Sequence, residues 1–345
     1  MLSETEQLPE GLLHLDASQL HTHLGGPTLI HLQGRREPPL FVSVLMHGNE
    51  NTGWEAVRRV LKRYLNEEGD AVDLPRSLSL FIANTEAAAE GMRHLPGQPD
   101  YNRVWPGAED TSSAEAEMMH QVVDIMSTRD LFASIDLHNN TGLNPHYACV
   151  NVLEHTALHL ASLFSRTVVY FVRPRGVASM AMAGLGPSVT LECGKVGQEH
   201  GTAHAAEYVD ACLHLAEIPQ HAVPAHDIDL FHTVAIVRVP QEVSFGFGEQ
   251  GYTMDFNADL DRLNFRELPV GTSFGRVNEA AQLPLRVRDE QDRDVGERYF
   301  EVEQGHLKTR LPVMPSMLTC DTTVIRQDCL CYLMERYNEH LADAG

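Results

Sequence analysis

The 345-residue sequence is poor in basic residues: 26 lysines and arginines stand against 48 aspartates and glutamates, a formal net charge of −22. This excess of negative charge argues against nucleic acid or an anionic membrane as the main partner, because their phosphates would be repelled. An anionic substrate would have to be attracted by a local group of cations, against the field of the whole chain.

Long apolar runs and paired cysteines are also missing. No apolar run approaches the ~18–20 residues that span a bilayer, and the N-terminal Met-Leu-Ser-Glu-Thr-Glu-Gln is acidic where a secretory signal is basic. We therefore expect a cytoplasmic protein with no membrane partner. No Cys-x-x-Cys motif occurs, so we expect reduced thiols at all six cysteines: Cys149, Cys193, Cys212, Cys320, Cys329 and Cys331.

The composition is that of an ordinary globular protein, with 43% hydrophobic and 21% charged residues, and the length allows two domains. Strand patterns alternate with amphipathic helical patterns up to about residue 215, and a segment with two prolines, 218–227, follows. We expect an α/β domain over residues 1–220, with a mixed sheet flanked by helices, and a smaller β-rich domain over residues 221–345.

The expected elements can be stated by position. In the first domain we expect strands at 29–32, 40–46, 77–83, 131–137, 147–152, 167–172 and 188–191, and helices at 54–65, 86–90, 113–129, 156–165 and 202–215. In the second domain we expect strands at 233–239, 251–254, 272–277, 283–287, 298–302 and 322–326.

The loop after the strand at 40–46 carries the first functional signal. It contains His47 and Glu50, and Gly53 opens the amphipathic helix that follows. In open α/β sheets ligands bind at the carboxyl ends of the strands. An imidazole and a carboxylate three residues apart can bind one cation there, and both are zinc ligands. The alternative is a polar loop in which the two side chains only hydrogen-bond each other.

The same pattern recurs twice. The strand at 131–137 runs into Asp136-Leu-His138, and the strand at 188–191 runs into Glu192-Cys-Gly194. Two histidines and one carboxylate are the ligand set of hydrolytic zinc sites. A second carboxylate, Glu192, could take the proton of an attacking water and return it to a leaving amine. Asp136 could orient a ligating histidine from behind.

A long irregular segment, residues 91–107, lies between these signals. Loops of this length inside compact domains are usually functional or disordered, and its aromatic residues favour an ordered loop. Its arginines, Arg93 and Arg103, could stabilise an oxyanion beside a metal. The pair His200 and His204 has helical spacing, but we expect it to be an exposed helix start rather than a metal site. We expect the early histidines to be surface or hydrogen-bonded residues: His14, His21, His23 and His31.

Taken in order, the motifs His47-Gly-Asn-Glu50-x-x-Gly53, Asn102-Arg103 followed by Pro106-Gly107, Asp136-Leu-His138-Asn139 and Glu192-x-Gly194 resemble the succinylglutamate desuccinylase/aspartoacylase family, a branch of the zinc carboxypeptidase superfamily. The resemblance covers about residues 40–200 and extends weakly to Asn264-Phe265 and Gly271-Thr272. It implies a zinc-carboxypeptidase-like fold and a catalytic domain over residues 1–220.

The resemblance also implies roles for seven residues. His47, Glu50 and His138 match the zinc ligands, and Glu192 matches the general base. Arg93 matches the arginine that polarises the scissile carbonyl. Asn102 and Arg103 match the pair that binds the α-carboxylate of the substrate, a task that suits a planar guanidinium.

Two departures from the family pattern affect the expected substrate. Arg93 and Asn102 lie 102 − 93 = 9 positions apart, about two more than is usual in the family. Where related members carry an arginine for an acyl-side carboxylate, this chain has Ser179-Met-Ala-Met-Ala-Gly184. These residues would suit an apolar acyl chain or a peptide side chain, or they are simply part of the core.

We therefore expect a zinc-dependent amidohydrolase that cleaves an N-acyl amino acid or a short peptide-like amide, with Zn²⁺ as cofactor and a homo-oligomer as a possible assembly. A metallocarboxypeptidase that acts on longer peptides is the second reading. A metal-binding or interaction protein that has kept the fold without the activity is the third.

Overall fold

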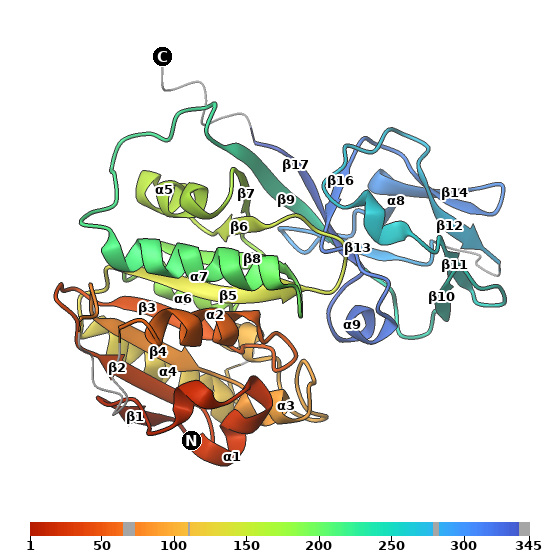
Figure 1. The fold of residues 1–345 in the computed structure, drawn as a ribbon. Helices are drawn as coiled ribbons and strands as arrows, with labels where there is room; N and C mark the ends of the chain where they lie inside the picture. Colours follow the sequence, from red (N-terminus) through yellow and green to blue (C-terminus); the bar gives the residue numbers. More distant parts are fainter. Residues whose placement is uncertain (65–72, 110, 279–282, 338–345) are drawn as a thin grey trace. The chain divides into compact units, whose positions relative to one another are not determined.

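The computed structural model describes residues 1–64, 73–109, 111–278 and 283–337 (Figure 1). The chain forms two compact units. The first comprises Met1–Asn139, His146–Tyr170 and Pro174–Asp229, and the second comprises Asn140–Pro145, Phe171–Arg173 and Leu230–Gly345. The chain thus enters the second unit at two short segments before residue 229, which no sequence pattern indicated. A domain division at 220/221 stays a prediction.

The first unit is built on a mixed sheet. Eight of its strands lie in the order β1-β2-β4-β3-β5-β8-β6-β7. Strand β3 runs parallel to both β4 and β5, whereas β2 is antiparallel to β4 and β6 is antiparallel to β8. The bounds are β1 (Ser3–Thr5), β2 (Thr28–Leu32), β3 (Leu40–Val44), β4 (Leu78–Ile82), β5 (Ala133–Asn140), β6 (Tyr147–Val150), β7 (Thr167–Tyr170) and β8 (Ser188–Lys195).

Helices flank this sheet, as the alternation of patterns predicts. They are α1 (Leu20–Leu24), α2 (Thr52–Leu61), α3 (Thr85–Ala89), α4 (Ala114–Ser127), α5 (His155–Phe164), α6 (Ala178–Met182) and α7 (Glu199–His214), with short 3₁₀ turns at Leu12–His14, Ala17–Gln19 and Tyr101–Arg103. Helix α2 packs against α7. The expected helix 54–65 is α2, and Leu65 lies outside the described residues.

The core explains why β3 can be so apolar. All five of its residues are buried, because the strand has sheet neighbours on both sides and helices cover the sheet. Phe41 on β3 and Phe81 on β4 share one core cluster with Trp105, Met119 of α4 and Met182 of α6. A strand buried in this way reads as a continuous hydrophobic run rather than as an alternation.

The second unit is rich in strands. One group has the order β9-β17-β16, with β13 paired to β9, and a five-stranded sheet has the order β10-β11-β12-β15-β14. The bounds are β9 (Asp229–Arg238), β10 (Phe245–Phe247), β11 (Met254–Phe256), β12 (Ser273–Val277), β13 (Arg286–Asp289), β14 (Phe300–Glu303), β15 (His306–Thr309), β16 (Met314–Ser316) and β17 (Cys331–Arg336). Short helical turns are η4 (Leu260–Leu263), α8 (Gly296–Tyr299) and α9 (Thr322–Gln327).

One expected strand is wrong. Residues 322–326 form helix α9 instead, although Thr-Thr-Val-Ile is a β-branched sequence. The side chain of Asp321 accepts hydrogen bonds from the backbone N–H groups of Thr323 and Val324, which caps the helix. Here a local cap outweighs the strand propensity of the residues that follow it.

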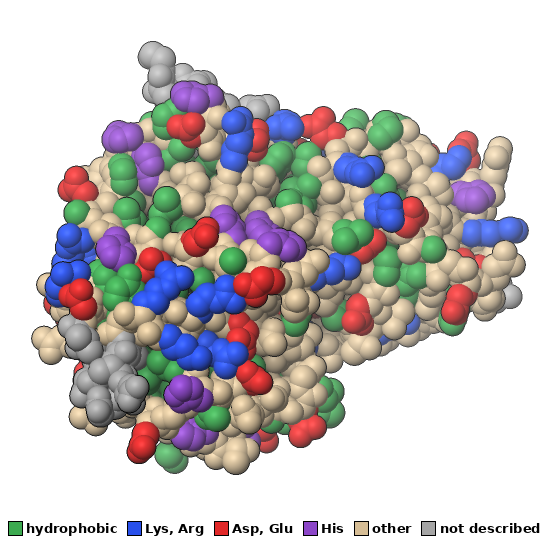
Figure 2. Space-filling view, viewed as in Figure 1, with side chains coloured by type: hydrophobic (Ala, Val, Ile, Leu, Met, Phe, Trp, Pro, Cys, Tyr) green, Lys and Arg blue, Asp and Glu red, His purple; other side chains and the backbone are tan. Residues whose placement is uncertain are grey.

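Three further features concern the length of the helices, the state of the cysteines and the charges on the surface. No described helix is both long and apolar enough to cross a membrane. All six cysteines are free, and only Cys320 is not buried. On the face that Figure 2 shows, acidic side chains lie beside the basic ones. Among the ion pairs of the first unit, Arg59 pairs with Glu199 and Arg63 pairs with Asp210.

Gly48, which follows His47, provides a test of how tightly the loop is packed. A Cβ atom there would lie 2.3 Å from backbone atoms of Ala87 and Ala88. We expect Gly48→Ala to lower the free energy of unfolding by about 1–3 kcal/mol, because backbone atoms must move to admit the methyl group. Gly184→Ala is the control, since the nearest atom there is 3.7 Å away. Equal denaturant midpoints for both variants would contradict the packing described.

Candidate functional site

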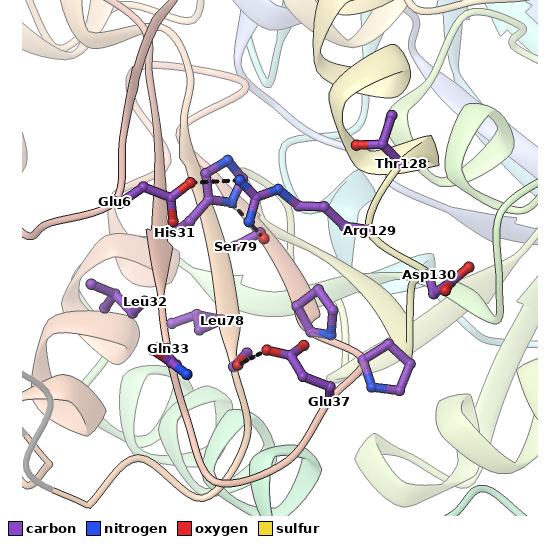
Figure 3. A pocket seen from close by; sticks show the side chains of 13 residues that line it. Glu6, His31, Leu32, Gln33, Glu37, Leu78, Ser79, Thr128, Arg129 and Asp130 are labelled. Atoms are coloured by element: carbon purple, nitrogen blue, oxygen red, sulfur yellow. Dashed lines mark hydrogen bonds and ion pairs between the residues drawn. The ribbon is translucent and has the colours of Figure 1, made fainter.

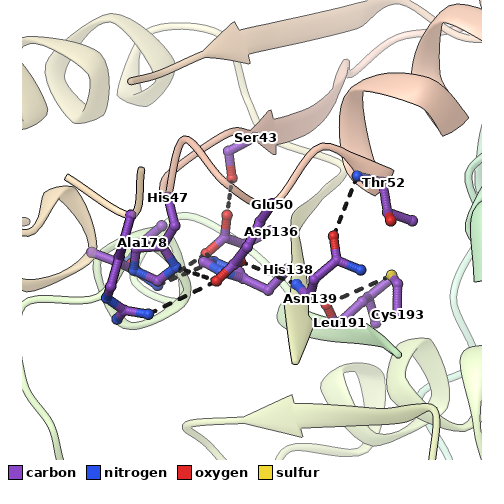
Figure 4. A network of polar contacts seen from close by, with 12 residues as sticks. Ser43, His47, Glu50, Thr52, Asp136, His138, Asn139, Ala178, Leu191 and Cys193 are labelled. Atoms are coloured by element: carbon purple, nitrogen blue, oxygen red, sulfur yellow. Dashed lines mark hydrogen bonds and ion pairs between the residues drawn. The ribbon is translucent and has the colours of Figure 1, made fainter. Parts of the chain in front are cut away.

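Three buried side chains converge after β3 and within β5 (Figure 4). Glu50 lies between the two histidines: its Oε1 is 2.8 Å from His47 Nδ1, and its Oε2 is 2.9 Å from His138 Nδ1. The centroids of the two imidazole rings are 5.0 Å apart. One donor atom from each of the three residues lies within 4.8 Å of the others. The structure therefore brings together the three residues that the sequence marks as metal ligands.

The sheet explains this convergence. Strands β3 and β5 are parallel neighbours, with Ser43 opposite Asp136, so both approach the site from the same edge. The strand β5 continues to Asn140, which is longer than expected, and His138 lies inside it. The strand can continue through Asn139 because this residue is hydrogen-bonded internally: its side chain donates to the carbonyl of Gly194, and its backbone N–H donates to Glu50.

Each histidine also contacts an aspartate through Nε2, the ring nitrogen that does not face Glu50. Asp136 Oδ2 lies 2.7 Å from His138 Nε2, and Asp100 Oδ1 lies 3.1 Å from His47 Nε2. Ser43 donates to the other oxygen of Asp136 at 2.7 Å. An outer carboxylate that accepts the Nε2–H leaves Nδ1 free as a ligand and fixes the tautomer. Asp136 was expected in this role, but Asp100 was not, because only the fold brings its loop to His47.

Charges within the site shift the pKa values of its residues. Burial by itself would raise the pKa of Glu50, but His47 and His138 lower it well below its usual range. Burial would lower the pKa of His138, but Asp136 and Glu50 raise it well above its usual range. Without a cation, the site thus favours an ionised Glu50 beside a protonated His138. A divalent cation could replace that proton, which is how metal binding and proton release are coupled.

The donor set fits zinc. Two imidazole nitrogens and a carboxylate oxygen, all from buried residues with exposed fractions of 4, 3 and 6% for His47, His138 and Glu50, are ligands that zinc prefers. The outer aspartates that complete such sites are also present. His47, Glu50 and His138 are therefore the residues that would hold the ion.

Arg93 reaches the same site despite its unusual spacing. Its Nε and Nη2 donate to Asp100 Oδ2 at 3.1 and 2.8 Å, and its Nη1 lies 3.8 Å from Glu50 Oε1. The side chain is 7% exposed. Burial would raise the pKa of Asp100, but Arg93, His47 and Arg103 lower it well below its usual range. Arg93 is thus both an ion-pair partner in the loop and a neighbour of the three candidate ligands.

Asn102 and Arg103 belong to the 3₁₀ turn Tyr101–Arg103. Asn102 is 6% exposed, and its Nδ2 lies 3.2 Å from His138 Nε2. Arg103 is half-buried and donates from Nη1 to the backbone carbonyl of Asn102 at 2.8 Å. The side chain of Asp100 accepts from the backbone N–H of Asn102, which begins the turn.

Glu192 lies inside β8, which extends beyond the expected end of the strand. Burial raises its pKa to about 8. His138 and Arg93 act in the opposite direction, whereas Glu50 and Asp136 raise the pKa further, so the carboxyl group lies within the field of two of the candidate ligands, Glu50 and His138. The next residue, Cys193, is fully buried and burial raises its pKa, which agrees with a small core residue rather than a nucleophile.

The segment 179–184 is only partly core. Helix α6 covers most of it, and Met182 is buried in the cluster that contains Trp105. Met180 is half-buried and Gly184 is exposed. Packing in the core therefore accounts for Met182 but not for Met180.

Among the described residues, the other histidines form no second group of two histidines and a carboxylate. His204 has no hydrogen bond to a carboxylate among the described residues. Its Nε2 lies 2.8 Å from the carbonyl oxygen of Phe164, and the ring of His146 stacks on the ring of His204. His31 is buried and hydrogen-bonded, as expected: its Nδ1 lies 2.8 Å from Ser79 Oγ, and its Nε2 lies 3.2 Å from Glu4 Oε1.

His31 also lines a separate cavity of about 600 Å³ (Figure 3). Glu4, Glu6 and His31 offer three donor atoms close together, but Arg129 already contacts Glu6 at 2.6 Å. The guanidinium of Arg129 also lies 3.8 Å from Glu4 Oε1, so these two carboxylates already have a cationic partner.

Fold and site together define an α/β protein with a His–Glu–His candidate metal site at the sheet edge. Residues 37–215, about half of the chain, match the succinylglutamate desuccinylase/aspartoacylase catalytic domain, and the chain belongs to this family. No curated protein sequence matches the chain.

Solved structures show that the fold extends over most of the chain. Succinylglutamate desuccinylase from Vibrio parahaemolyticus is 14% identical, with a TM-score of 0.58, over 90% of this chain and 86% of that one. The Chromobacterium violaceum enzyme of the same name is 16% identical, with a TM-score of 0.54, over 88% and 86%. Murine aminoacylase 3 is 15% identical, with a TM-score of 0.51, over 88% and 97%. At these identities the similarity establishes the shared fold.

The role of Asp136 can be tested by metal binding. Asp136→Asn keeps the shape of the side chain but removes the charge that supports His138, so zinc affinity should fall about 10–100-fold. Competition with a chromogenic chelator measures it. Asp227→Asn is the control, because that side chain is 57% exposed. If Asp136→Asn binds zinc as tightly as the control, Asp136 does not support the metal.

Proposed function

We propose that this protein is a zinc-dependent hydrolase that cleaves the amide bond of an N-acyl amino acid. The observation that supports it is the buried His47–Glu50–His138 cluster with Glu192 in its field, in a chain of the succinylglutamate desuccinylase/aspartoacylase family. Zinc held by these three residues would supply Lewis-acid chemistry, acidifying a water molecule and polarising the scissile carbonyl.

Glu192 is proposed as the general base and acid. It takes a proton from the water that attacks the amide carbonyl and then passes this proton to the nitrogen of the leaving amine. The pKa of about 8 that burial produces applies to the metal-free protein. A divalent cation nearby would lower this value, because it favours the ionised carboxylate. Glu192 would then be ready to accept a proton near neutral pH.

Arg93 and Arg103 are proposed as the cations of the site. Arg93 lies beside Glu50 and is oriented by Asp100, so its guanidinium can stabilise negative charge on the oxygen of the scissile carbonyl. Arg103 is half-buried and can bind the α-carboxylate of the amino acid, the task that the family resemblance assigns to it together with Asn102. These local cations would attract an anionic substrate to a chain of net charge −22.

The base is tested by Glu192→Gln, which keeps size and burial but cannot accept a proton. We expect kcat to fall about 10²–10⁴-fold while zinc stoichiometry stays unchanged. Glu199→Gln is the control, since that side chain is 76% exposed. A Glu192→Gln variant with wild-type turnover would exclude Glu192 as the base.

Metal dependence and substrate class are tested together on a panel of N-acyl amino acids, dipeptides and longer peptides. We expect a chelator to abolish hydrolysis, zinc to restore it, and kcat/KM to be highest for N-acyl amino acids. Preference for the longer peptides would favour a metallocarboxypeptidase. Zinc binding with no turnover of any member would favour a protein that has kept the site without the activity.

A further inference from the structure

Three histidines outside the candidate metal site lie close together in the first unit. His200 and His204 are four residues apart on α7, and His146 directly precedes β6. The ring centroid of His146 is 5.3 Å from that of His200 and 5.2 Å from that of His204. The corresponding distance between His47 and His138 is a similar 5.0 Å. The sequence shows only the helical pair, and the fold adds the third imidazole.

One nitrogen of this group is buried and unpaired. Nε2 of His146 is almost inaccessible to solvent and forms no hydrogen bond with a described residue. It faces the backbone of Gly194, where a Cβ atom would lie 3.0 Å from this nitrogen and 3.4 Å from Oε1 of Gln198. The space that a side chain would take at Gly194 is therefore bordered by an imidazole nitrogen and an amide oxygen, both of which can bind a cation.

The second imidazole is fixed in one tautomer. Nε2 of His204 lies 2.8 Å from the backbone carbonyl oxygen of Phe164. A carbonyl oxygen can only accept, so Nε2 carries the hydrogen and Nδ1 keeps a free lone pair. The third imidazole, that of His200, is exposed, so its ring can turn about the side-chain bonds.

The charges around the group favour a metal that prefers nitrogen ligands. Burial lowers the pKa of His146, and the neighbouring His204 and His200 lower it further, so this imidazole is neutral near neutral pH. The carboxylate that precedes His200, Glu199, is paired with Arg59 at 2.8 Å. Neutral imidazoles suit zinc, nickel and copper, whereas magnesium and calcium require oxygen ligands.

We infer that His146, His200 and His204 form a second metal site, which binds a divalent transition metal such as zinc. Among the described residues, these three do not yet bring one nitrogen each within 4.8 Å of the others, so His200 turns toward His146 as the ion binds. The bound ion joins the first turns of α7 to the segment that leads into β6. The site does not depend on the proposed function.

Zinc titration of the metal-free protein against a chromogenic chelator tests the second site. We expect the wild type to bind two equivalents, of which His47→Ala removes only the one at the candidate site beside Glu192. His200→Ala should weaken only the other equivalent, by about 10-fold or more, because the loss of an outer partner of a ligand already costs that much. His120→Ala is the control, since this histidine is also helical and exposed.

His146→Phe tests the imidazole that the sequence pattern does not reveal. The change keeps an aromatic ring beside Phe164, whose centroid lies 6.2 Å from that of His146, but removes the unpaired nitrogen. We expect it to weaken the second equivalent as much as His200→Ala does. His200→Ala keeps the inference testable if His146→Phe does not fold, because the side chain of His200 is exposed.

The outcomes separate this inference from the proposed function. A second equivalent with wild-type affinity in His146→Phe would show an ordinary helical pair and overturn the inference. So would a second equivalent that His200→Ala leaves unchanged, or a single equivalent that His47→Ala abolishes. A single equivalent that His47→Ala retains and His200→Ala weakens would support the inference, while contradicting zinc binding in the proposed function.

Discussion

The site depends on one shared carboxylate. Glu50 bridges two imidazoles that come from different strands, with oxygens 2.8 and 2.9 Å from their Nδ1 atoms. This bridge is possible because parallel strands β3 and β5 approach one edge of the sheet side by side. Buried charges are stable only when they are paired and hydrogen-bonded, and here the pairing continues outward through Asp100 and Asp136. The cluster is therefore a network in which each charged group is paired and hydrogen-bonded with its neighbours.

This network favours rigidity around the three candidate ligands. Arg93 is held by Asp100, and Asp100 also supports His47 and the backbone of Asn102. A residue that stabilises charge in a transition state is most effective when it is oriented in advance and does not need to reorganise. A single loop segment, from Arg93 to Arg103, supplies this orientation, although it contains no strand and only one 3₁₀ turn.

The sequence was most informative where side-chain chemistry and strand pattern coincide. His47, Glu50 and His138 could be predicted as neighbours because the ends of parallel strands meet at one edge, and the structure brings them together. Asp100 could not, since its loop has no periodic pattern and its place depends on tertiary packing. Helix α9 was predicted as a strand because β-branched residues dominate it, whereas the cap at Asp321 decides its conformation. The two segments that cross into the second unit, 140–145 and 171–173, have no local signature at all.

The buried cysteines provide the protein with an internal reporter. Cys149 and Cys193 lie on β6 and β8, and burial raises the pKa of both thiols well above its usual range. A buried thiol that is held in its protonated form reacts with an alkylating reagent mainly when its strand leaves the sheet. The labelling rate at Cys193 would thus record how often the strand that bears Glu192 opens, and Cys320, which is partly exposed, would provide the reference rate within the same molecule.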